Sequence, residues 1–119
     1  MRRITVAVVM GTRPEAIKMA PVVRALQRHH DDVTTQVVAT AQHRQMLNQI
    51  LELFEIEPDV DLELMRENQG LADLTARVVT RLERLWRQAP PAVVLVQGDT
   101  TTAFAAGLAA YYCQVQIGH

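Results

Sequence analysis

Residues 11–18 (GTRPEAIK) have the composition of a site for an anionic group. Pro14 and Glu15 suit the first turn of a helix, because proline loses no needed donor there and an acid complements the helix dipole. The unpaired N–H groups of such a helix start, with Arg13 before it and Lys18 a turn later, would attract a phosphate or pyrophosphate. An ordinary strand-to-helix turn with surface charges is the better explanation of this segment when it is taken alone.

Residues 97–102 (QGDTTT) place a single carboxylate, Asp99, after a strongly apolar run. Following a buried strand and a glycine, Asp99 would be partly desolvated, and it could bind a sugar hydroxyl or transfer a proton. The alternative is that Asp99 caps the next helix, together with the threonines. A position opposite the basic segment would favour chemistry on a phosphate ester.

Composition narrows the classes of function. The 119 residues are 49% hydrophobic and 21% charged, which indicates a folded domain. Twelve basic and thirteen acidic residues leave a net charge of −1, so no general attraction to nucleic acid or to a membrane surface is expected. The apolar run 4–10 is too short to span a bilayer and precedes no cleavage pattern, which favours a cytoplasmic protein.

Cofactor, metal and thiol chemistry find little support in the sequence. The chain has neither Gly-x-Gly-x-x-Gly nor Gly-x-x-x-x-Gly-Lys-Ser/Thr, which disfavours dinucleotide and P-loop chemistry, and we expect no cofactor. Cys113 is the only cysteine, so it forms no internal disulfide and is interpreted as a small buried hydrophobe. No metal role is assigned to the histidines, which are His29, His30, His43 and His119.

Hydrophobic periodicity predicts strands that alternate with helices. Strands are expected at 4–10, 35–39, 92–96 and 115–117, with a possible edge strand at 60–64. Helices are expected from Pro14 to about His29, with either a kink at Pro21 or a second start at Ala20, and then after a Thr40 cap through the apolar stripe 46–54. Two more are expected from Leu71 until Pro90-Pro91 ends the helix, and from about Ala103 to Tyr112. Gly11 would allow close approach of the backbone to a ligand.

This order of elements predicts a doubly wound α/β fold with a parallel sheet and right-handed crossovers. In the strand order 3-2-1-4-5, the sheet reverses between its first and fourth strands, and a crevice opens at their carboxyl ends. Residues 11–18 and 97–102 follow those two strands, so they should face each other. The fifth strand is barely complete, and we expect that the chain is truncated.

Three motifs, in order, carry a specific resemblance: GTRPEAIKMAP at 11–21, TAQHRQML at 40–47 and GDTTT at 98–102. They are similar to those of the non-hydrolysing UDP-N-acetylglucosamine 2-epimerases, and the likeness extends along essentially the whole chain. The resemblance implies a GT-B fold of two Rossmann-like lobes, of which residues 1–119 would form the amino-terminal one. It also implies interconversion of UDP-N-acetylglucosamine and UDP-N-acetylmannosamine, by elimination of UDP to a 2-acetamidoglucal and its re-addition.

The same resemblance implies roles for individual residues. Arg13 and Lys18 match a basic pair that binds substrate, and Asp99 matches a carboxylate that does acid/base work. A possible site for an activating second UDP-sugar matches Gln42, His43, Gln45 and Gln69, although the arginine expected beside the last is Asn68 here. The partners implied are a UDP-sugar, a carboxyl-terminal lobe and a second copy of the protein, since the family is usually homodimeric.

Several hypotheses about the function of this chain remain open. The isolated chain is expected not to epimerise, because half of the cleft and much of the phosphate clamp would come from a second lobe. A lobe of a hydrolysing epimerase or of a GT-B glycosyltransferase would also handle nucleotide sugars. A non-catalytic fragment that keeps a nucleotide-sugar or interaction surface is the alternative from a different class.

Overall fold

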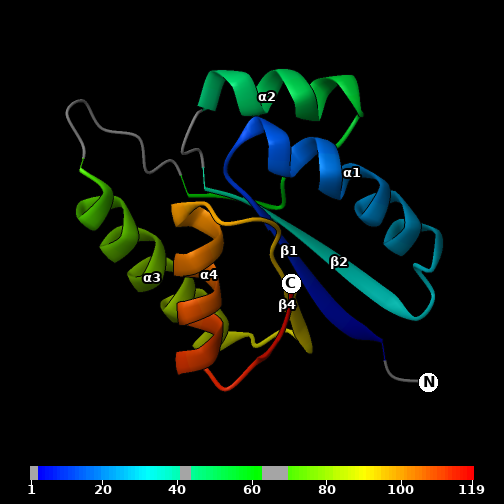
Figure 1. Cartoon of the computed structure of the whole chain (residues 1–119). Coiled ribbons are helices and arrows are strands. Elements are labelled where there is room, and N and C mark those ends of the chain that lie inside the picture. The colour runs from blue at the N-terminus through cyan, green and yellow to red at the C-terminus, as the bar shows by residue number, and fades with distance from the viewer. Residues whose placement is uncertain (1–2, 41–43, 63–69) are drawn as a thin grey trace.

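The computed structural model describes residues 3–40, 44–62 and 70–119, and these form one parallel sheet with helices on both faces (Figure 1). The sheet contains five strands in the order β3-β2-β1-β4-β5, so the predicted strand order is confirmed. The strands are β1 (Ile4–Met10), β2 (Val33–Ala39), β3 (Val60–Asp61), β4 (Val93–Leu95) and β5 (Gln116–Gly118).

Four helices alternate with these strands: α1 (Arg13–Arg28), α2 (Arg44–Leu53), α3 (Leu71–Gln88) and α4 (Thr101–Tyr112). Helices α1 and α2 cover one face of the sheet, and α3 and α4 cover the other (Figure 1). Strand β1 is apolar from Val6 to Met10 because this part serves both layers: Ala7 and Val9 join the core under α3 and α4, and Val6 and Val8 join the core under α1 and α2. None of the helices described is long and apolar enough to cross a membrane.

Most element boundaries agree with the sequence predictions to within two residues. Helix α1 continues through Pro21 as one element, so the predicted second start is wrong. Strand β2 begins at Val33, and α4 begins at Thr101 because the hydroxyl of Thr100 caps it. Strand β3 is shorter than predicted, although positions 63 and 64 of that prediction lie outside the described residues.

The register of the central strands brings the chemical segments together. β1 and β2 pair along their whole length, so that Met10 lies beside Ala39 and both strands end at the same level. The N–H group of Thr40 then donates to the carbonyl of Met10 at 3.1 Å. β4 pairs with the other side of β1, so the segments that follow β1, β2 and β4 all leave the carboxyl edge of the sheet at the reversal of strand order.

Candidate functional site

A buried carboxylate joins the two segments that the sequence singled out. The side chain of Glu15, in the first turn of α1, is only 2% exposed. Its Oε1 accepts hydrogen bonds from the N–H groups of Gly11 at 2.8 Å and Thr12 at 2.9 Å, and its Oε2 accepts one from the hydroxyl of Thr100. Three donors and the positive end of the α1 dipole offset the cost of burying this charge. The expected meeting of the two segments therefore takes place through Glu15 and Thr100.

Gly11 is needed for close packing inside the protein. A Cβ atom placed on Gly11 would lie 2.3 Å from both the Thr40 and the Thr102 hydroxyl oxygens. Those two hydroxyls are fully buried and lie 3.1 Å apart, in hydrogen-bond contact. The segments that follow β1, β2 and β4 thus meet at Gly11. The sequence analysis expected Gly11 to let the backbone approach a ligand, but its close neighbours in the structure are Thr40 and Thr102.

The basic side chains of the first segment are exposed at the start of α1. Arg13 and Lys18 are both solvent-exposed, and neither forms an ion pair with any of the residues described. The N–H groups of Gly11 and Thr12 are already bound to Glu15, and Pro14 has none, so the prediction of unpaired backbone donors is wrong for these positions. An anion here would be held mainly by the two long cationic side chains.

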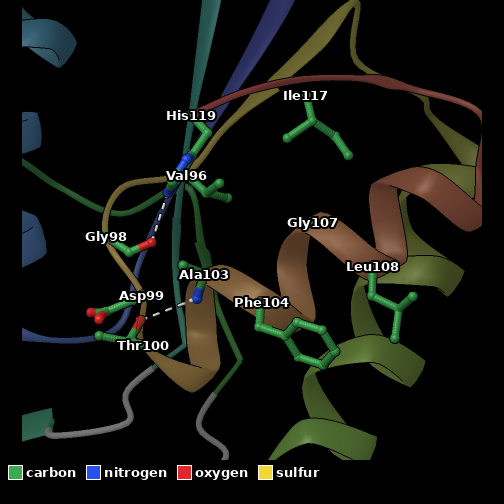
Figure 2. A pocket seen from close by; sticks show the side chains of 10 residues that line it. All are labelled: Val96, Gly98, Asp99, Thr100, Ala103, Phe104, Gly107, Leu108, Ile117 and His119. Carbon is green, nitrogen blue, oxygen red and sulfur yellow. Dashed lines mark hydrogen bonds between the residues drawn. The ribbon is translucent and has the colours of Figure 1, made fainter.

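Asp99 lies on a tight turn, and the residues on both sides of it make hydrogen bonds that stabilise the turn. Gly98 precedes it with φ of +81°, a conformation that favours glycine, and Thr100 follows it as the cap of α4, accepting from the N–H of Ala103 at 3.1 Å. The Nε2 atom of His119 lies 2.8 Å from the carbonyl oxygen of Gly98 (Figure 2). A carbonyl can only accept, so this ring nitrogen must carry the proton.

The carboxylate of Asp99 itself is exposed, and it makes no hydrogen bond or ion pair with the described part of the chain. The predicted partial desolvation is therefore wrong for this lobe. Capping by Asp99 is also wrong, because Thr100 supplies the capping oxygen. Asp99 is left as an exposed carboxylate on the turn that leaves the carboxyl end of β4.

A cavity of about 500 Å³ opens beside this turn. Its polar end is formed by Gly98, Asp99, Thr100 and His119, and the side chains of Phe104, Leu108 and Ile117 lie on its other side (Figure 2). Arg13 and Lys18 do not line it. Asp99 therefore lines this cavity, and the basic side chains at the start of α1 lie outside it.

The structure describes only one of the four residues assigned to a possible activator site. Gln45 is exposed near the start of α2, whereas Gln42, His43 and Gln69 lie outside the described residues. No group of three or more His, Cys, Asp or Glu side chains suited to a metal ion occurs within the described ranges. Sequence reasoning missed the contact between His119 and Gly98, and only the pairing of β5 with β4 reveals it.

Comparison with known proteins places this geometry in a family. A family model described as UDP-N-acetylglucosamine 2-epimerase matches residues 24–119. The UDP-N-acetylglucosamine 2-epimerase of Bacillus subtilis is 50% identical over all 119 residues, which span 31% of that protein's length. The sequence resemblance is thereby confirmed.

Comparison with solved structures gives the same family. The crystal structure of a Listeria monocytogenes protein described as a UDP-N-acetylglucosamine 2-epimerase superposes with a TM-score of 0.93 at 51% identity, covering all of this chain and 31% of that one. The Neisseria meningitidis UDP-GlcNAc 2-epimerase, solved bound to UDP-GlcNAc, gives a TM-score of 0.91 at 51% identity over 97% of this chain and 31% of that one. The predicted Rossmann-like lobe is confirmed, and the chain belongs to the UDP-N-acetylglucosamine 2-epimerase family.

Proposed function

We propose that this chain supplies the amino-terminal half of an active site that interconverts UDP-N-acetylglucosamine and UDP-N-acetylmannosamine. The observation that carries the proposal is the hydrogen bonding of Glu15 to both segments, which brings the turns of Arg13 and Asp99 to one point on the sheet edge. Family membership supports the reaction type, and the Neisseria meningitidis relative was solved with UDP-GlcNAc bound.

In the proposed reaction, Arg13 and Lys18 bind the diphosphate, and their charges stabilise UDP as it leaves. A base removes the proton from C2 of the sugar as the bond between C1 and the UDP oxygen breaks, which leaves a C1–C2 double bond in a 2-acetamidoglucal. The UDP oxygen then attacks C1, and an acid returns a proton to the opposite face of C2. Asp99 is assigned to one of these proton transfers.

A second lobe is part of the proposal. Residues 1–119 would act as a single Rossmann-like lobe, and the exposure of Arg13, Lys18 and Asp99 fits a site whose other wall comes from elsewhere. We further propose that the complete enzyme is a homodimer and acts in the cytoplasm, where nucleotide sugars are at hand. The possible activator site at Gln42, His43, Gln45 and Gln69 also stays a proposal.

The test compares turnover by the chain alone with turnover by the chain fused to the part of the Bacillus subtilis relative that lies outside the aligned third. The fusion should epimerise in a coupled assay, and the 119-residue chain alone should not. In the fusion, Asp99→Asn should lower kcat by about 10²-fold or more. Arg13→Ala should raise KM, whereas Arg28→Ala, an exposed arginine at the far end of α1, should change neither constant.

Two results would contradict the proposal. One is comparable turnover by the isolated chain, which would show that no second lobe is needed. The other is a fusion that turns over with unchanged kcat after Asp99→Asn, which would remove Asp99 from the chemistry.

A further inference from the structure

We propose that Glu15 and Thr100 are positioning residues that set the distance and orientation between Arg13 and Asp99. Their hydrogen bond, together with the two backbone bonds of Glu15, is called the Glu15–Thr100 clamp below. What Arg13 and Asp99 do with a ligand rests on the proposed function. That their turns are held together by the clamp rests on the hydrogen bonds themselves.

The hydrogen bond between Glu15 and Thr100 is not needed to cap either α1 or α4. Glu15 already completes the start of α1 by accepting from the N–H of Thr12, and Thr100 already caps α4 by accepting from Ala103. Neither task requires a contact between residues 85 positions apart in the sequence. A carboxylate held at 2% exposure cannot exchange a lost donor for bulk water, so the link to Thr100 is costly to break.

The clamp acts on Arg13 and Asp99 through the backbone. Arg13 follows Thr12, whose N–H group is bound to Glu15, and Asp99 precedes Thr100, whose hydroxyl is bound to the same carboxylate. Both side chains project into solvent, and neither contacts another side chain of the described residues through a hydrogen bond or ion pair. The clamp therefore sets the relative placement of the two turns from which these side chains extend.

Substitutions at Thr100 separate the clamp from the helix cap. Thr100→Asp keeps an excellent capping oxygen but loses the hydroxyl donor and sets a second carboxylate against Glu15. Thr100→Ser keeps both the cap and the donor and is the matched control. Thr100→Val keeps the shape of threonine but loses both functions, and it replaces Thr100→Asp in every comparison if the aspartate variant does not fold.

The first measurement is amide hydrogen exchange of the ¹⁵N-labelled 119-residue chain by NMR. Thr100→Asp should shift the resonances of the Gly11 and Thr12 amides and speed their exchange by about tenfold, because Glu15 loses its fixed orientation. Thr100→Ser should leave both amides as in the unmodified chain. Unchanged amides in Thr100→Asp would overturn the inference, since a residue that only caps α4 would not affect the start of α1.

The second measurement is a titration of the same samples with UDP, followed at Arg13 and Asp99. The unmodified chain and Thr100→Ser should bind with similar affinity, and Thr100→Asp should bind at least about tenfold more weakly. Equal affinity in all three would overturn the positioning role. If the unmodified chain shows no response to UDP, the same titration is made on the three forms of the fusion protein described above; no response of the unmodified fusion contradicts the proposed function, and the exchange measurement still decides whether the clamp exists.

Discussion

Gly11 is the residue at which segments following three strands come into contact. The Thr40 and Thr102 hydroxyls, 62 positions apart in the sequence, meet over its α-carbon. Any side chain at this position must push apart two buried hydroxyls that bond to each other. The close packing of Gly11 is therefore a condition for bringing the turns of Arg13 and Asp99 to the same edge.

Gly11→Ala should destabilise the protein by about 1–3 kcal/mol, because the new methyl group would lie far inside the contact distance of both threonines. A midpoint of thermal unfolding lowered by about 4 °C or more, measured by circular dichroism, is the expected result. Gly107→Ala is the control of opposite sign, since its Cβ meets nothing within 4 Å and alanine favours the helix by about 0.5–1 kcal/mol. An unchanged midpoint for Gly11→Ala would show that the threonine pair is not packed as described.

Cys113 should react slowly with iodoacetamide at neutral pH. Cys113 is only partly buried, so its interpretation as a buried hydrophobe is wrong. This partial burial raises the pKa of its thiol above the ordinary value, the Arg87 charge opposes the increase, and the Glu83 charge adds to it. Because the thiolate is the reactive form, the rate should rise with pH and reach half its maximum above pH 9.0, the ordinary value. Glu83→Gln should move the midpoint down, and Arg87→Met should move it up; a midpoint below 9.0 in the unmodified chain would contradict the assignment.

The sequence was informative about residue types and less so about their partners. The sequence predicts Glu15 at a helix start, which is a local property, but its bond to Thr100 depends on the parallel pairing of β1 with β4 and is not visible in either segment. Asp99 was predicted to be partly desolvated because a buried strand precedes it, yet exposure depends on what covers the turn. Neighbours in space, and not neighbours in sequence, decide both outcomes.

At the scale of elements, the contact between α3 and the sheet shows why the helix was easy to predict. Leu74, Val78, Leu82 and Trp86 recur on one face and are all buried in the core beneath α3 and α4. The prediction for β3 was the least accurate of the strands, because β3 lies at the edge of the sheet, where pairing with β2 alone sets its length. Periodicity predicts which face is buried, whereas register with a neighbouring strand fixes the ends.

Trp86 joins α3 to β2 by more than apolar contact. Its indole Nε1 donates to the side-chain oxygen of Gln36 at 3.2 Å, while the ring is fully buried. Trp86→Phe should reduce the free energy of unfolding by about 1–3 kcal/mol, because it leaves a cavity and removes the donor from Gln36. Urea unfolding followed by circular dichroism measures this loss.

The matched control for that loss is Arg84→Ala, an exposed position on the same helix, which should stay within about 0.5 kcal/mol of the unmodified chain. Equal stability of Trp86→Phe and the unmodified chain would mean that neither the indole N–H nor the larger ring of Trp86 stabilises the fold.

At the scale of the whole molecule, the chain spans 31% of the length of the Bacillus subtilis and Listeria monocytogenes relatives. Its sheet carries helices on both faces, and the long hydrophobic residues left uncovered include several along α4 and β5. Phe104 is 64% exposed and Ile117 is 43% exposed, and both line the cavity beside Asp99. β5 is also an edge strand, hydrogen-bonded to β4 alone among the described strands.

An apolar hollow next to a strand edge favours association between copies of the 119-residue chain. We expect sedimentation velocity to show a mean mass that rises with protein concentration. The double substitution Phe104→Lys and Ile117→Lys should shift the chain toward monomer, because it places two like charges in the hollow. Leu53→Lys is the control: Leu53 is 72% exposed at the end of α2, in the helix layer on the opposite face of the sheet, and its substitution should not alter the distribution. A monomer at every concentration, or an equal effect of Leu53→Lys, would show that the face formed by α4 and β5 does not drive association.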